Sequence, residues 1–215
     1  MQTITPFLNK KYNIIYADPP WTYKAYSEKG EGRSAKKHYP TMDIEDICNL
    51  PVQDIAADDC TLFMWATFPN LLDAFKVIEA WGFSYKTIAF VWVKQNKKAD
   101  TLFLGMGHWT RSNAEVCLLA TKGSPKRLSA NVRQVVISHI EEHSKKPDEV
   151  RQRIVELVGD MPRIELFAHK QTDGWDAWGN ETDKFSKEHS EVTEKRKKHK
   201  KLVNLGQISF INFDI

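Results

Sequence analysis

An acidic residue, two prolines and a tryptophan follow an apolar run near the start of this 215-residue chain. Residues 14–17 are typical of a buried strand, and its ladder cannot continue through Pro19 and Pro20, because proline lacks a backbone donor. The turn would hold Trp21 beside the carboxylate of Asp18 at the carboxyl end of the strand, where open α/β sheets bind ligands. Such a group suits a flat ligand that bears an amino group. The alternative is a strand end with a solvated acid and a core tryptophan.

The elements that must position this turn follow in a strand and helix pattern. Residues 41–50 read as a short helix, residues 61–66 as a strand buried on both faces, and residues 83–94 as a long strand. Pro69 opens a helix between the two strands, so the order predicts a parallel sheet. The apolar face of that helix is expected to consist of Leu72, Phe75, Ile78 and Ala80.

The second half of the chain continues the pattern. Residues 95–113 read as a basic loop with an aromatic residue, residues 115–121 and 163–168 as strands, and residues 169–181 as a polar segment. A helix is expected to begin at Pro147, since proline suits the first helical position and acids the first turn. Residues 126–139 fit no clear pattern.

Composition excludes several classes of protein. Hydrophobic residues make up 41%, which excludes a disordered chain, and no apolar run is as long as a membrane span. The first twelve residues lack the apolar core of a signal peptide, so we expect a cytoplasmic protein. Three widely spaced cysteines and the absence of HExxH spacing indicate neither zinc nor a disulfide framework, and we predict no metal.

The net charge of +3 is unevenly distributed. Residues 184–201 hold eight Lys or Arg and three Glu, so this segment carries +5 and the remainder −2. Nucleic-acid contacts by the body must therefore come from local patches. We divide the chain into a domain, residues 1–181, and a basic helical tail with a short apolar end, residues 182–215. The tail either binds a polyanion or is a solvated helix, and residues 202–215 are an alternative contact for a homodimer.

Several short motifs follow one another in order between about residues 12 and 181. They are Ala17-Asp18-Pro19-Pro20-Trp21, Tyr39-Pro40-Thr41-Met42, Leu62-Phe63-Met64-Trp65, Trp92-Val93-Lys94, Gly107-His108-Trp109, Glu115, Lys122-Gly123, Lys146-Pro147-Asp148-Glu149, Ile164-Glu165-Leu166-Phe167, Gly174-Trp175-Asp176 and Trp178-Gly179-Asn180-Glu181. This ordered set is the basis of a resemblance to the MT-A70 family of adenine N6-methyltransferases. It implies an α/β, Rossmann-like methyltransferase fold: a mostly parallel sheet with helices on both faces, in which the catalytic motif precedes the cofactor-binding strand.

The resemblance also implies a reaction and a cofactor. We expect methyl transfer from S-adenosylmethionine to the N6 amino group of adenine in nucleic acid, with DNA favoured over RNA for a compact chain. A non-catalytic nucleic-acid-binding subunit is the alternative in another class, and the intact acidic motif argues against it. Cytosine N4 is a third target, but such enzymes more often carry Ser-Pro-Pro or Asn-Pro-Pro motifs.

The expected catalytic residues are Asp18, Pro19, Pro20 and Trp21. Asp18 and the Pro19 carbonyl can accept the two amino hydrogens and aim the nitrogen lone pair at a methyl group, with Trp21 stacking on the base. The resemblance places Lys146 at the methionine carboxylate. Cofactor contacts are expected from Asp18, Lys146, Glu165, His169, Gln171, Asn180 and Glu181.

Two cofactor positions depart from better-known family members, since His169 replaces an arginine and Gln171 a histidine. Glu165 lies in an otherwise apolar strand, so it needs ribose hydroxyls or a basic side chain as donors. Glu115 either binds a substrate amino edge or pairs with Arg111. The expected substrate contacts are Tyr23, Lys36, Lys37, Tyr39, His108, Trp109, Arg111 and Glu115.

Overall fold

The computed structural model describes residues 7–22, 41–107, 109–142 and 145–179. Eight strands form one sheet. The strands are β1 (Tyr12–Ala17), β2 (Ala56–Ala66), β3 (Ser84–Asn96), β4 (Ala99–Leu102), β5 (Ala114–Lys122), β6 (Val135–His139), β7 (Arg163–Leu166) and β8 (Asp176–Trp178). The helices are α2 (Ile44–Cys48), α3 (Leu71–Ala80) and α4 (Glu149–Val158), with 3₁₀ turns η2 (Val52–Asp54) and η3 (Phe68–Asn70).

The sheet runs in the order β4-β3-β5-β2-β1-β7-β8, and β6 pairs with β3. Strand β1 is flanked by parallel neighbours, β2 and β7, and β8 continues the parallel half. Strand β5 runs antiparallel between β2 and β3. The expected strand–helix–strand unit therefore exists, but its two strands do not pair with each other. The sheet contains both parallel and antiparallel pairs. The sequence did not predict this, because an apolar run indicates the burial of a strand and not its direction.

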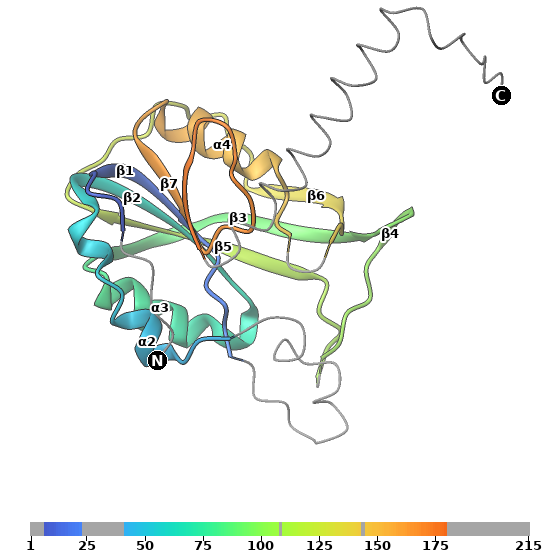
Figure 1. The fold of residues 1–215 in the computed structure, drawn as a ribbon. Coiled ribbons are helices and arrows are strands. Elements are labelled where there is room, and N and C mark those ends of the chain that lie inside the picture. The colour runs from blue at the N-terminus through green and yellow to red at the C-terminus, as the bar shows by residue number, and fades with distance from the viewer. Residues whose placement is uncertain (1–6, 23–40, 108, 143–144, 180–215) are drawn as a thin grey trace, which may run out of the picture.

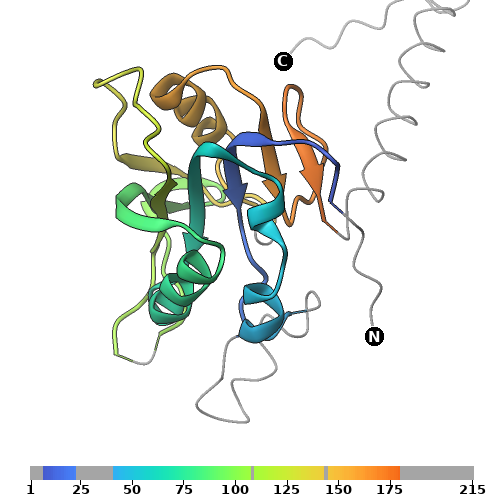
Figure 2. The ribbon, with the colours of Figure 1, turned by 90° about the vertical axis from the view of Figure 1, so that its left-hand side faces the viewer.

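Helices cover both faces of the sheet, as expected (Figures 1 and 2). Successive residues of β1 point to opposite faces. Ile15 and Ala17 join the core under α2 and α3, whereas Ile14 and Tyr16 join the core under α4. This alternation places the end of β1 between two packed layers, so the chain that leaves it at Asp18 starts from a well-defined position.

The buried face of α3 differs from our prediction. Ala74, Val77 and Ile78 are buried, but Leu72 is 76% exposed and Phe75 lies at the surface. Ala80 is exposed as well. Of the four predicted residues, Ile78 alone is buried. The helix instead turns its small Ala74 toward the sheet, which allows a close approach of helix and strands.

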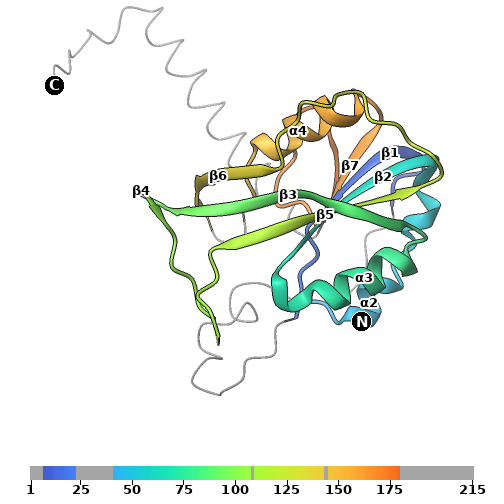
Figure 3. The same cartoon turned by 180° about the vertical axis from the view of Figure 1, so that it is seen from behind.

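Two segments without predicted strands contain them. Strand β4 lies within the expected loop of residues 95–113 and forms a hairpin with β3 that extends away from the body (Figure 3). Strand β6 lies within the unplaced residues 126–139 and pairs in parallel with β3. Both are short. Every residue of β4 is exposed, and β6 begins with three apolar residues of which only Val136 is buried, so neither sequence has the alternation of apolar and polar residues that predicts a strand.

One guanidinium binds the start of β6 at its outer edge. Arg153 on α4 donates from Nη1 to the carbonyls of Arg133 and Val135, both at 2.8 Å. Unpaired strand edges invite pairing with other chains, and a charged side chain on the edge opposes it. Val135 and Ile137 have exposed apolar side chains, so we expect this edge to associate with a second copy of the chain when Arg153 is absent.

We therefore expect Arg153→Ala to promote self-association and to lower the free energy of unfolding by about 1 kcal/mol. Sedimentation velocity over a concentration series measures the first effect and urea denaturation the second. Gln152→Ala, at an exposed position of the same helix, is the matched control. Equal sedimentation of the two variants at every concentration contradicts the protective role.

Candidate active site

The Asp18-Pro19-Pro20-Trp21 turn is held in place from both sides. The Asp18 amide still donates to the Leu166 carbonyl of β7 at 3.4 Å, although β1 itself ends at Ala17. Beyond the prolines, the Trp21 indole donates to the Trp65 carbonyl at 3.0 Å. The turn is therefore anchored to both parallel neighbours of β1, which positions the Asp18 carboxyl at the carboxyl end of the sheet.

Trp21 does not offer the stacking face that we expected. Only 9% of the residue is exposed, and it belongs to the core under α2 and α3. The core tryptophan that the sequence left as the alternative is what the structure shows. The Pro19 carbonyl already accepts the Trp21 amide at 2.8 Å, so one of its two lone pairs remains for a ligand.

Four charged side chains from four elements meet beside this turn. The Lys146 Nζ lies 2.6 Å from Asp18 Oδ2 and 3.4 Å from Glu115 Oε2. The other Glu115 oxygen lies 2.5 Å from Lys94 Nζ. These side chains are only 10–18% exposed, and they alternate in sign. They come from the end of β1, from β3, from β5 and from the segment before α4, so the cluster exists only when the sheet is assembled.

The two carboxyl groups of the cluster have opposite pKa shifts. Burial raises the pKa of Asp18 above its ordinary value, and the adjacent Lys146 offsets this only in part. Burial also acts to raise the pKa of Glu115, but Lys146 and Lys94 outweigh it and hold that pKa below its ordinary value. When the pH falls, Asp18 is therefore expected to take up a proton before Glu115.

Glu165 has a basic protein partner on α4. Arg151 on α4 donates to both of its carboxylate oxygens, at 2.6 and 2.7 Å, and the pair is buried. The Arg151 guanidinium also lies over the Tyr16 ring, 5.5 Å from its centroid. Tyr16 in turn accepts the Trp65 indole N–H at 2.6 Å. Of the two donors that the sequence left open, the structure shows the basic side chain.

The turn after β7 brings further predicted residues to the same end of the sheet. Phe167 adopts a left-handed conformation, with φ of 61°, and redirects the chain toward His169. His169 acts to lower the pKa of the Asp18 carboxyl, against the larger effect of burial. Gln171 donates to the Trp175 carbonyl at 2.6 Å, within its own loop. The structure thus brings His169 to the acidic turn and commits the Gln171 amide to holding the loop.

The remaining predicted residues separate into two groups. Trp109 is 94% exposed and Arg111 is exposed beyond the β3–β4 hairpin, so neither is part of the four-charge cluster. Glu115 pairs with two lysines and not with Arg111. The predicted residues that lie outside the described part of the chain are Tyr23, Lys36, Lys37, Tyr39, His108, Asn180 and Glu181.

Sequence reasoning missed Lys94 and Arg151. A signal for Lys94 was present, since it belongs to one of the motifs that carry the resemblance, Trp92-Val93-Lys94. The signal for Arg151 was weaker. It is the third residue of α4 and lies on the helix's buried face, where a charged residue needs a partner.

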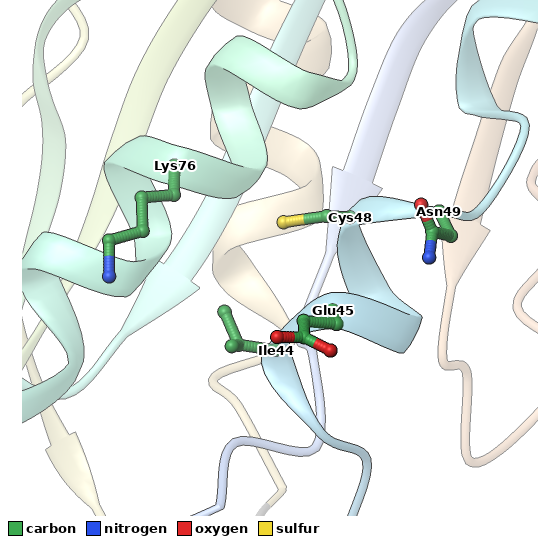
Figure 4. A pocket seen from close by; sticks show the side chains of 5 residues that line it. All are labelled: Ile44, Glu45, Cys48, Asn49 and Lys76. Atoms are coloured by element: carbon green, nitrogen blue, oxygen red, sulfur yellow. The ribbon is translucent and has the colours of Figure 1, made fainter.

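A cavity of about 400 Å³ lies elsewhere, between α2 and α3. It is lined by Ile44, Glu45, Cys48, Asn49 and Lys76 (Figure 4). None of these residues belongs to the predicted site or to the cluster around Asp18. The candidate site is therefore defined by its converging charges and not by this cavity.

Two kinds of feature are absent from the described part of the chain. No group of three or more His, Cys, Asp or Glu side chains there is arranged to hold a metal ion. No helix in the same ranges has the length and apolar character needed to cross a membrane.

A mixed α/β sheet that presents an Asp-Pro-Pro turn and an ammonium group at the carboxyl ends of its central strands is a Rossmann-like methyltransferase fold. A family model described as MT-A70 matches residues 12–181, most of the chain. The chain belongs to the MT-A70 family, and it is a methyltransferase. Such enzymes use S-adenosylmethionine as the methyl donor.

Similar proteins differ in how much of their length the chain covers. A type II methyltransferase, M.MunI of Mycoplasma sp, is 39% identical over 80% of this chain and 78% of its own length. A putative N(6)-adenosine-methyltransferase, MT-A70-like, of Medicago truncatula is 30% identical over 80% of this chain, but only 26% of its own length is covered. The human N(6)-adenosine-methyltransferase catalytic subunit METTL3 is 27% identical, with 80% of this chain and 28% of METTL3 covered.

Proposed function

We propose that this protein transfers a methyl group from S-adenosylmethionine to the N6 amino group of adenine in DNA. The observation that carries the proposal is the Asp18 carboxylate, held at the end of β1 against the Lys146 ammonium. The names of the N(6)-adenosine-methyltransferase relatives support adenine N6 as the acceptor. The choice of DNA rests on the resemblance to compact members of the family, and RNA is the alternative substrate.

The proposed catalysis is orientational and electrostatic. An adenine amino nitrogen is a poor nucleophile because its lone pair is delocalised into the ring. Asp18 can accept one amino hydrogen and the free lone pair of the Pro19 carbonyl the other, which draws the nitrogen toward tetrahedral geometry. The nitrogen gains positive charge as the new bond forms, so the Asp18 carboxylate stabilises the transition state more than the ground state.

The residues present fit the proposed cofactor. S-adenosylmethionine supplies an electrophilic methyl group, and its methionine part carries one carboxylate and one ammonium group. Lys146 would hold the carboxylate, and the neighbouring carboxyl groups of the cluster suit the ammonium group.

Gly179 lies close to the turn after β7: a Cβ there would come 2.7 Å from the Ala168 carbonyl oxygen. Glycine therefore lets β8 and the β7 turn approach closely at this edge.

The proposed function is tested by incubating the protein with methyl-labelled S-adenosylmethionine and matched single-stranded and duplex DNA and RNA. Nucleoside analysis of each product identifies the methylated base and the preferred nucleic acid. We expect N6-methyladenine in DNA. Label on cytosine N4 contradicts the acceptor, label on RNA alone contradicts the DNA assignment, and no label on any substrate favours the non-catalytic subunit.

Replacement of Lys146 by methionine tests the cofactor contact. We expect the dissociation constant for S-adenosylmethionine to rise by about 10–100-fold, because a hydrogen bond to a charged group contributes about 1.5–3 kcal/mol. Isothermal titration calorimetry measures the change. Lys76→Met on α3, at an exposed lysine remote from Asp18, is the control. Equal affinity in the two variants excludes Lys146 from the cofactor site.

Other expectations concern residues outside the described ranges. Residues 22–38, which we expect to form a basic loop because they hold five Lys or Arg, the basic tail and the ribose contacts of Asn180 and Glu181 stay predictions. We include the loop and the tail in the proposed nucleic-acid surface because their lysines and arginines suit contact with phosphates.

A further inference from the structure

Lys94 is a partly buried lysine that the proposed transfer does not use. It lies near the end of β3, and its side chain is 18% exposed. Its ammonium group contacts Glu115 Oε1 and lies over the Trp92 ring, 4.8 Å from the centroid. Keeping a lysine in such a place costs desolvation, and a specific partner is needed to offset that cost.

Lys94 and Lys146 share the Glu115 carboxylate, so the charge of Lys94 affects whether Lys146 pairs with Glu115 or with Asp18. Glu115 has two oxygens, and Lys94 takes one at 2.5 Å while Lys146 lies 3.4 Å from the other. The Lys146 ammonium is closer to Asp18, at 2.6 Å. If Lys94 lost its charge, Glu115 would be the less neutralised carboxylate, and it would draw Lys146 away from Asp18.

We infer that Lys94 is a positioning residue for methyl transfer, which acts through Glu115 to keep Lys146 against Asp18. This inference rests on the proposed function, since Asp18 and Lys146 are the groups that would contact the substrate and the cofactor. Lys94 itself need touch neither. Its role is to keep the acidic pair and the basic pair balanced, so that Asp18 stays ionised in a partly buried site.

A purely structural ion pair makes a different prediction. Loss of a structural Lys94–Glu115 pair would lower stability but leave the ionisation of Asp18 unchanged. Among the described residues, the charged and titratable groups that act electrostatically on Asp18 or respond to its charge are Lys146, Glu115, His169 and Cys117. Burial and the charge of Asp18 raise the pKa of the Cys117 thiol well above its usual range, so it stays neutral. Loss of the Lys94 charge would therefore change the ionisation of Asp18 indirectly, because Glu115 would attract Lys146 more strongly.

The kinetic experiment compares Lys94→Met, which removes the charge, with Lys94→Arg, which keeps it. In Lys94→Met we expect kcat to fall by about 10–100-fold, as for a catalytic group misplaced by about 1 Å. We also expect the acid limb of the kcat profile to move to higher pH, because Asp18 loses part of its compensating charge. Lys94→Arg should restore both. Lys86→Met, at an exposed position of the same strand, is the matched control.

A second measurement is independent of activity. Carbon-13 NMR of the carboxyl groups, without ligand, follows the titration of Asp18 and Glu115 in the folded protein. We expect both groups to titrate at higher pH in Lys94→Met than in the wild type, and Lys94→Gln serves if the methionine variant does not fold. An unchanged Asp18 titration overturns the inference. If the wild type methylates no nucleic acid, the proposed function fails while the NMR result still decides the role of Lys94.

Discussion

Replacement of Asp18 by asparagine is expected to lower kcat/KM for methyl transfer by about 10²–10³-fold or more, as for other losses of a preorganised electrostatic group. The amide keeps the size of the side chain but removes the negative charge that would stabilise a developing positive nitrogen. Lys146 would still have Glu115 as a partner, so the cluster need not collapse. Steady-state kinetics with the preferred nucleic acid measure the loss.

The same change should not destabilise the protein at pH 7. Burial raises the Asp18 pKa in the folded state, so the fold binds that proton more tightly than the unfolded chain does. The stability from this group is present below the unfolded pKa and is lost as the pH rises through the folded pKa. At pH 7 the ionised carboxylate therefore weakens the fold, and asparagine should leave the urea midpoint unchanged or raise it.

Asp46→Asn, on the exposed side of α2, is the control for the Asp18 variant and should match the wild type in both assays. Substantial turnover in Asp18→Asn would contradict the assignment of Asp18 as the group that activates the amine. A large drop in its urea midpoint would contradict the interpretation of Asp18 as a functional group kept at a cost in stability.

Replacement of Arg151 by methionine is expected to have the largest effect on stability. The change removes both hydrogen bonds from Glu165 and leaves a buried carboxylate without its cation. Breaking a buried pair in this way costs about 3–5 kcal/mol. Urea denaturation followed by circular dichroism measures the free energy of unfolding, and Gln152→Met, exposed on the same helix, should stay within about 0.5 kcal/mol of the wild type.

The double change Arg151→Met with Glu165→Met distinguishes the cost of an unpaired buried carboxylate from the loss of packing. If the Arg151 variant is less stable because the Glu165 charge is uncompensated, removal of that charge should recover much of the lost stability. Equal destabilisation in the single and double variants would show that the packing of Arg151 against Tyr16, and not the orphaned carboxylate, accounts for the loss.

Local features of the fold were predictable from residue order. The apolar run before Asp18 predicted β1, and its abrupt end at two prolines placed the carboxylate at the carboxyl end of a strand. The acids after Pro147 predicted the start of α4 to within two residues. These features depend on neighbours along the chain, where periodicity and backbone chemistry act directly.

Tertiary structure alone decided the partners. Asp18 meets Lys146 across 128 residues of chain, and the Lys94–Glu115 pair joins two strands that sequence analysis did not align. Strand β5 lies antiparallel between β2 and β3, a placement that apolar runs cannot indicate. The sequence by itself therefore determined which residues could do chemistry and at which strand end. The assembled sheet decided which charges face each other, because long-range pairing depends on strand order and packing of the whole domain.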